Sequence, residues 1–207
     1  LDKINFSNFG EKNNLPIIKS FQNLKNISYN SYVVKERYGS GSLKIGLNLN
    51  MKNAIMFSKK LKNPIFQKFI PGIEISADIW ISKKYKIKGV ILRTRDTIIR
   101  GESKVTTSIE NNKIKNEIIK VVKKLRIIGH VVIQGIVDKK NKFNIIECNP
   151  RFGGASTLSI KKGLDSFYWS ILESLGEDVD FFPFIYDKKK ITQVRYEIDK
   201  YFYDNNI

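Results

Sequence analysis

The stretch QGIVDKKNKFNIIECNPRFGG, residues 134–154, combines amide and carboxyl side chains at spacings that could hold a divalent cation. Two runs with alternating apolar residues, 131–138 and 143–148, flank a polar turn at 139–142. Alternation on both sides of a short polar segment predicts a β-hairpin. The candidate chemistry therefore depends on which side chains this hairpin brings together.

The register of the hairpin follows from its turn. If the turn centres on residues 140 and 141, Gln134 lies opposite Glu147, with β-carbons about 5 Å apart. Side chains alternate between the two faces of a strand, so Asn149 shares a face with Glu147. The predicted pairs are Asp138 with Phe143, Ile136 with Ile145, and Gln134 with Glu147.

One carboxylate with two amide carbonyls is an oxygen-only ligand set. Such a set suits Mg²⁺ or Mn²⁺ bound to nucleotide phosphates better than Zn²⁺. Arg151 follows directly, where its guanidinium could neutralise a phosphoryl oxygen. The alternative is an ordinary hairpin edge with scattered polar residues.

A second candidate site is the segment YVVKERYGSGSLKIGLNL, which predicts a strand, a loop rich in glycine and serine, and a returning strand. Gly39 and Gly41 lack β-carbons, so backbone N–H groups there could approach a triphosphate, and Ser40 and Ser42 could add hydroxyl donors. Lys35 precedes the glycines, unlike the lysine of a P-loop. A simple Gly-Ser-Gly turn is the alternative.

The segment from Gln67 to Ile70 precedes a Pro-Gly break and could expose a backbone edge to a purine ring. Glu74, on the next predicted strand, could accept hydrogen bonds from ribose hydroxyls. Further along, Arg93 and Arg95 share a strand face and suit phosphate or carboxylate groups. A plain hairpin and a solvated strand face are the respective alternatives.

Composition sets limits on the class of protein. The 207 residues are 42% hydrophobic, which predicts a globular chain with a core. The net charge of +17 would attract polyanions, but the basic residues are spread along the chain without a nucleic-acid-binding motif, so nucleic acid is an unlikely partner. Without an apolar run long enough for a membrane or a leader pattern, we expect a cytoplasmic protein.

Two residues often found in active sites have no supporting motif here. Cys148, the single cysteine, should face the core between two outward-facing neighbours and act as a small hydrophobic residue. His130, the single histidine, follows a predicted helix with no partner nearby in sequence, so a general-base or metal role is not expected. Helices are predicted near 51–61, 114–125, 156–162 and 166–175, with a final strand after residue 190.

Taken together, separated pieces of the chain resemble the ATP-grasp superfamily, in particular the carbamoyl-phosphate synthase large subunit. They are Asp2-Lys3, VVKERYGSGS (33–42), QKFIPGIE (67–74), the strand ending at Gln134, and IIECNPRFGG (145–154). The resemblance implies an α+β fold with two lobes, each a mainly antiparallel sheet packed on helices, with nucleotide between them. A small lobe at 1–68 and a large lobe at 69–207 are expected.

The resemblance also implies roles for individual residues. Lys3 and Lys35 would contact phosphates, as would the mobile loop Gly39 to Ser42, while Arg95 lies in a region that resembles the family only loosely. Lys68 and Ile70 would contact adenine through their backbone, in a nucleotide-binding segment that also includes Gln67 and Phe69; Gln67 stands where a glutamate is frequent. Glu74 would bind ribose, Gln134, Glu147 and Asn149 would bind Mg²⁺, and Arg151 would lie near the transferred phosphoryl group.

The family phosphorylates a carboxylate with ATP to an acyl phosphate, which an amine or similar nucleophile then captures. We therefore expect an ATP- and Mg²⁺-dependent carboxylate-amine ligase acting on a small carboxylate. This branch usually carries an α/β domain before the first motif, so a missing N-terminal domain or a homo-oligomer is an expected partner. The alternatives are a nucleotide-binding split or truncated subunit that needs a partner domain and, less favoured, a basic nucleic-acid-binding protein.

Overall fold

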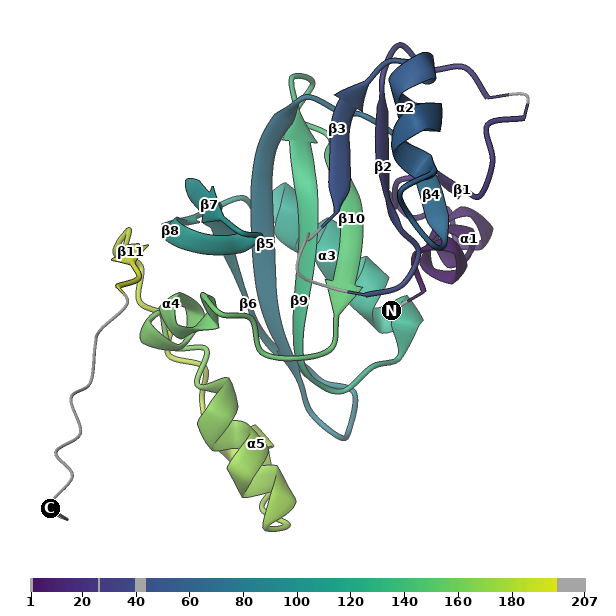
Figure 1. Ribbon diagram of the computed structural model, residues 1–207. Coiled ribbons are helices and arrows are strands. Elements are labelled where there is room, and N and C mark those ends of the chain that lie inside the picture. The colour runs from purple at the N-terminus through teal and green to yellow at the C-terminus, as the bar shows by residue number, and fades with distance from the viewer. Residues whose placement is uncertain (1, 26, 40–43, 197–207) are drawn as a thin grey trace, which may run out of the picture.

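The computed structural model describes residues 2–25, 27–39 and 44–196, which form two antiparallel sheets with helices packed against them (Figure 1). In the first part of the chain are α1 (Lys3–Lys12), β1 (Ser20–Phe21), β2 (Tyr32–Glu36), β3 (Ile45–Leu49), α2 (Met51–Ser58) and β4 (Pro64–Lys68). Then follow β5 (Gly72–Ile81), β6 (Ile87–Thr94), β7 (Thr97–Ile99), β8 (Glu102–Ile109), α3 (Asn112–Leu125), β9 (Gly129–Asp138) and β10 (Phe143–Asn149). The last elements are α4 (Ser156–Lys161), α5 (Ser166–Ser174), the 3-10 helix η1 (Val179–Phe181) and β11 (Thr192–Val194).

The smaller sheet has four strands in the order β1-β4-β2-β3. Helix α2 covers one of its faces, where Ala54 packs against Tyr32, Val34 and Phe66 (Figure 1). Asn50 caps this helix by accepting a hydrogen bond from the amide of Asn53 at 2.9 Å. The opposite face of the small sheet faces the large sheet across a cleft that residues of both sheets line.

The larger sheet has seven strands, with the path β10-β9-β5-β6-β8-β11 and β7 paired to β8. Its two faces differ because side chains alternate along each strand. In β5, Ile75, Ala77, Ile79 and Ile81 enter a core covered by α3, whose buried residues Ile114, Ile118, Val121 and Val122 have helical spacing. The intervening residues Glu74, Ser76, Asp78 and Trp80 lie on the other face.

The segment before the small sheet is attached to the large one. The amide of Ile145 donates to the carbonyl of Pro16 at 2.7 Å, and the amide of Ile18 donates to the carbonyl of Ile145 at 2.9 Å. Phe6 and Ile17 are buried in the core beneath the large sheet. Residues 2–20 therefore connect the two sheets; the division into lobes at residue 68 stays a prediction.

The β9-β10 hairpin forms, but its predicted register is wrong near the turn. Phe143 pairs with Val137 and Ile145 with Gly135, one position away from the expected partners. The reason is local: Asp138 ends β9 and pairs with Lys142, since its amide donates to the carbonyl of Lys142 at 3.0 Å. Its Oδ1 also accepts from the amides of Lys140 at 2.9 Å and Lys142 at 3.0 Å, which closes the turn one residue earlier than predicted. A bulge between Ile145 and Glu147 then shifts the ladder, so Glu147 does pair with Gln134 as predicted.

Two other sequence predictions concern Cys148 and membranes. Cys148 lies in the core as expected, and burial raises its pKa to about 12, which suits a packing residue and not a thiolate nucleophile. Among the described residues, no helix has the length and apolar character needed to cross a membrane.

Candidate functional site

A cleft of about 750 Å³ lies between the two sheets. Most described residues singled out in the sequence line it: Lys3, Lys35, Gly39, Gln67, Lys68, Phe69, Ile70, Glu74, Arg95, Gln134 and Glu147. They come from α1, both sheets and the connection between them. Ser40, Gly41 and Ser42 lie outside the described residues. Asn149 and Arg151 are described but do not line the cleft.

The Asp2-Lys3 motif holds the start of the glycine-serine loop. Asp2 caps α1 by accepting from the amides of Ile4 and Asn5, and its carboxylate pairs with Arg37 at 2.6 Å, which lowers the pKa of Asp2 to about 2. The Lys3 Nζ donates to the carbonyl of Gly39 at 3.1 Å. The N-terminus of α1 therefore positions the Lys3 ammonium group and, through Asp2 and Arg37, the segment that leads from β2 into the loop.

Two lysines and one carboxylate, Lys3, Lys35 and Glu147, line the same cleft. Lys3 and Lys35 are both buried, and burial lowers the pKa of each, that of Lys35 to about 8. The charge of Glu147 opposes this lowering in both cases, while Lys3 lowers the Lys35 pKa further. Within the described residues, Lys35 Nζ has no hydrogen-bond or ion-pair partner. Two cations held close together in a cleft favour a polyanionic ligand.

The connection at Gln67 to Ile70 leaves a backbone edge open. Strand β1 begins at Ser20, opposite Gln67, so its pairing with β4 ends before Lys68. Gln67 itself is buried, and its Nε2 donates to Ser20 Oγ at 2.8 Å. Its side-chain amide is therefore engaged within the protein. Lys68, Phe69 and Ile70 also line the cleft, and of their main-chain groups the Phe69 amide donates to the carbonyl of Ser31 at 3.0 Å.

Glu74 and Arg95 form an ion pair at the other side of the cleft. Arg95 Nη2 also donates to the carbonyl of Gly101 at 2.8 Å, which fixes the guanidinium beside the carboxylate. The Arg95 side chain is nearly buried while that of Glu74 is 30% exposed, so the carboxylate can still accept from a ligand hydroxyl.

The β-bulge directs two consecutive side chains of β10 into the cleft. Ile146 and Glu147 both line it, which regular alternation would prevent. Glu147 lies opposite Gln134, and Asn149 Nδ2 donates to Glu147 Oε1 at 2.8 Å. The three predicted ligands are therefore neighbours, although Asn149 reaches the site from its edge.

This donor set fits a hard divalent cation bound together with phosphate. It offers carboxylate and amide oxygens, but only one formal negative charge, and two buried lysines lie nearby. No group of three or more His, Cys, Asp or Glu side chains in the described residues forms a metal site. Phosphate oxygens would have to supply the remaining ligands and charge.

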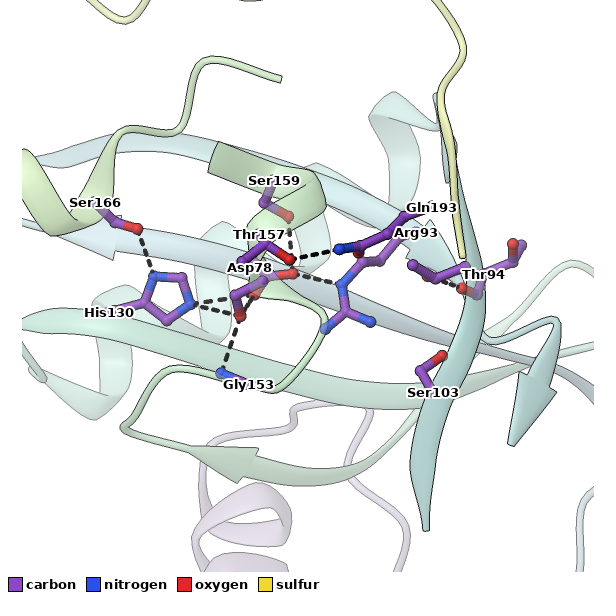
Figure 2. A network of polar contacts seen from close by, with 12 residues as sticks. Asp78, Arg93, Thr94, Ser103, His130, Gly153, Thr157, Ser159, Ser166 and Gln193 are labelled. Carbon is purple, nitrogen blue, oxygen red and sulfur yellow. Dashed lines mark hydrogen bonds and ion pairs between the residues drawn. The ribbon is translucent and has the colours of Figure 1, made fainter. Parts of the chain in front are cut away.

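Sequence reasoning missed a buried polar network on the same face of the large sheet (Figure 2). Asp78 is fully buried and accepts from Arg93 Nε at 2.7 Å, from Ser159 Oγ at 2.9 Å and from His130 Nε2 at 3.1 Å. Burial by itself raises the pKa of Asp78, but Arg93, His130 and Ser156 outweigh it and leave the pKa well below its ordinary value. Arg93 is thus an internal ion-pair partner, not a solvated residue.

No local signal in the sequence could have identified this network. Its members come from β5, β6, β9 and α4, and His130 and Asp78 are 52 residues apart. The alternate positions of Glu74, Ser76 and Asp78 place three polar side chains on one strand face, but they do not identify the partners of those side chains.

Two layered antiparallel sheets with a cationic cleft between them define a class of nucleotide-binding architecture. Comparison gives the family: a model of the ATP-grasp domain matches residues 2–155. The chain belongs to the ATP-grasp family, and the predicted fold is confirmed. The resemblance to the carbamoyl-phosphate synthase branch stays a prediction.

Solved structures agree on the fold. Biotin carboxylase from Campylobacter jejuni is 18% identical with a TM-score of 0.71, over 86% of this chain and 46% of that one. The biotin carboxylase domain of 2-oxoglutarate carboxylase from Hydrogenobacter thermophilus, solved with MgADP, is 18% identical with a TM-score of 0.75, over 94% and 49%. N5-carboxyaminoimidazole synthetase from Staphylococcus aureus is 15% identical with a TM-score of 0.68, over 86% and 51%.

The chain spans about half the length of these matched structures. No curated protein matched it.

Proposed function

We propose that the chain is the ATP-binding and catalytic portion of an ATP- and Mg²⁺-dependent carboxylate-amine ligase. The observation that carries this proposal is that Lys3, Lys35 and Glu147 line one cleft between the two sheets, where both lysines are buried and feel the charge of the carboxylate. Family membership and the match to a structure solved with MgADP support it.

The apolar part of the cleft suits a purine ring. It contains side chains from both sheets, namely Val33, Ile45, Leu47, Ile136 and Ile146. The open main chain of Lys68 to Ile70 could pair with the ring edge, and Glu74 could accept from ribose hydroxyls. Phosphates would then extend toward Lys3, Lys35 and the glycine-serine loop.

Charge neutralisation is the chemistry that these residues would perform. A phosphoryl group passing from ATP to a carboxylate carries negative charge on its oxygens, and prearranged cations stabilise that charge. Lys35 and Lys3 would hold phosphate oxygens, Arg151 would approach from the hairpin end, and Gln134, Glu147 and Asn149 would hold the divalent ion. Mg²⁺, or Mn²⁺ in its place, would supply further positive charge when bound.

The finer assignment, similarity to carbamoyl-phosphate synthase with an amine or ammonia as acceptor, rests on the sequence motifs. Because ATP is the proposed substrate, we expect the protein to act in the cytoplasm. The acceptor would be bound in part by groups beyond this cleft.

The second candidate function is a nucleotide-binding subunit that turns over only with a partner domain or another copy of the chain. The observation that favours it is that Arg151, the residue expected near the transferred phosphoryl group, does not line the cleft. Both candidates predict MgATP binding, and they differ in whether this chain alone releases ADP in the presence of a carboxylic acid.

Calorimetric titration with MgATP tests the shared prediction. Lys35→Ala and Glu147→Ala should each weaken binding at least tenfold, because each loses a charge facing the phosphates or the metal. Lys52→Ala and Glu177→Ala, which change exposed residues away from the cleft, are the matched controls. Unchanged binding in both cleft variants would remove the proposal.

A further inference from the structure

The buried network around Asp78 ends on the loop that carries Arg151. Ser156 Oγ donates to Asp78 Oδ1 and accepts from the amide of Gly153 at 2.9 Å (Figure 2). A β-carbon at Gly153 would come within 3.2 Å of Ser156 Oγ, so the backbone there is closely packed. The loop after β10 is therefore tied to the centre of the network.

His130 connects the network to the same loop by a second route. The carboxylate of Asp78 can only accept, so the 3.1 Å contact places the imidazole proton on Nε2. The ring also stacks on Phe152, with centroids 4.3 Å apart and planes inclined by 20°. Phe167 covers the other side of Phe152, at 3.9 Å and 16°. Phe152 is thus held between two rings, one of them fixed by a buried ion.

Arg151 is attached to this clamped residue. Its Nη1 donates to the carbonyl of Phe152 at 3.0 Å, and its side chain is otherwise exposed. Any displacement of the Phe152 ring would move the adjoining peptide that orients the guanidinium. A chain of contacts therefore leads from Asp78 through His130 and Phe152 to Arg151.

The network has the elements of a hydrolytic triad, because Ser166 Oγ lies 3.0 Å from His130 Nδ1 while Asp78 holds Nε2. Ser166 is fully buried at the start of α5, so no substrate can reach its hydroxyl. Asp78 is also neutralised by Arg93. The arrangement holds a loop in place and does not activate a nucleophile.

We propose that His130 is a positioning residue, which acts through Phe152 to orient Arg151 outside the cleft lining, from where its guanidinium would approach a bound γ-phosphate. The proposal rests on the proposed function, since Arg151 matters only where a γ-phosphate is bound. It goes beyond that function by assigning a role to a residue that does not line the cleft.

Two substitutions separate the two contacts of the imidazole. His130→Gln keeps an amide donor for Asp78 but loses the stacked ring. His130→Phe keeps the ring but leaves the buried carboxylate without one donor. Val121→Ala, on the α3 side of the large sheet, is the control for simple destabilisation.

The binding experiment compares a non-hydrolysable MgATP analogue with MgADP by calorimetry, because only the former carries a γ-phosphate. Arg151→Ala should reduce the preference for the triphosphate about tenfold. His130→Gln should reduce it about fivefold, yet by less than twofold when Arg151 is already alanine. Val121→Ala should leave the preference unchanged. Equal effects of His130→Gln in both backgrounds would overturn the proposal.

Amide hydrogen exchange at residues 151–155 of the free protein provides a readout that needs no nucleotide. His130→Gln should accelerate exchange at least tenfold relative to Val121→Ala. At the Phe152 amide, the acceleration should be smaller in His130→Phe than in His130→Gln. Unchanged exchange would overturn the positioning role. Absent MgATP binding by the unmodified protein would instead remove the proposed function, so the two failures are distinguishable.

Discussion

Replacing Lys35 by methionine should stabilise the protein at neutral pH while weakening its binding of MgATP. Lys35 is 5% exposed, and burial lowers its pKa from 10.5 to about 8. One pKa unit corresponds to about 1.4 kcal/mol, so keeping the ammonium charged in the folded protein costs about 3 kcal/mol. Methionine has a similar volume and no charge, and removes this cost.

The advantage in stability of Lys35→Met over the unmodified protein should depend on pH. Below pH 8 the lysine is charged in both the folded and the unfolded protein, and the full cost is present. Between pH 8 and 10.5 the unfolded chain binds more protons than the folded one, so the unmodified protein gains stability as pH rises. The advantage of Lys35→Met should therefore be greatest at pH 7 and small above pH 10.5.

Urea denaturation at pH 7 and at pH 10.5, for the unmodified protein and Lys35→Met, measures this difference. Lys52→Met on the exposed side of α2 is the matched control and should change little at either pH. A free-energy difference for Lys35→Met that is the same at both pH values would refute the reasoning, since it would show that burial of charge is not its origin.

The same pKa predicts how nucleotide affinity varies with pH. With a pKa of about 8, the Lys35 amine is about nine-tenths charged at pH 7 and about one-tenth charged at pH 9. The dissociation constant for MgATP should therefore rise about tenfold between these values. Lys35→Arg, which keeps its charge throughout, should show a flat profile in this range. An equally steep profile in Lys35→Arg would assign the titration to another group.

Three further perturbations test other parts of the structure. Glu147→Gln should weaken MgATP binding and affect binding of metal-free ADP much less, because it removes the only carboxylate of the proposed ligand set. Calorimetry with and without Mg²⁺ measures both affinities. Equal losses of affinity would argue against a metal role for Glu147. Asp78→Asn should destabilise the fold by about 3–5 kcal/mol in urea denaturation, since it leaves the buried Arg93 without a counter-charge; a loss below 1 kcal/mol would contradict that account. Gly72→Ala should also destabilise, by about 1–3 kcal/mol, because a β-carbon there would lie 2.1 Å from the carbonyl oxygen of Val137; an unchanged melting temperature would show that β5 and β9 separate easily.

Local patterns in the sequence predicted several of the helices and strands and the charged residues that line the cleft. The spacing of Ile114, Ile118 and Val121 predicts α3, and alternation around the turn predicts the β9-β10 hairpin, because both periods are properties of the backbone. The motifs around Lys3, Lys35 and Glu74 do line one cleft. Their roles toward a ligand stay predictions.

Only the tertiary structure decided the finer geometry. A bulge between Ile145 and Glu147 directs Ile146 and Glu147 to the same cleft. Regular alternation of side chains along a strand does not predict such a bulge. The pairing of Asp78 with His130 joins strands and a helix far apart in the chain, so neither residue carries a signal of its partner. The sequence determines which face of each strand is apolar. The hydrogen-bond partners of a buried polar group, in contrast, depend on which distant segments pack against it in the tertiary structure.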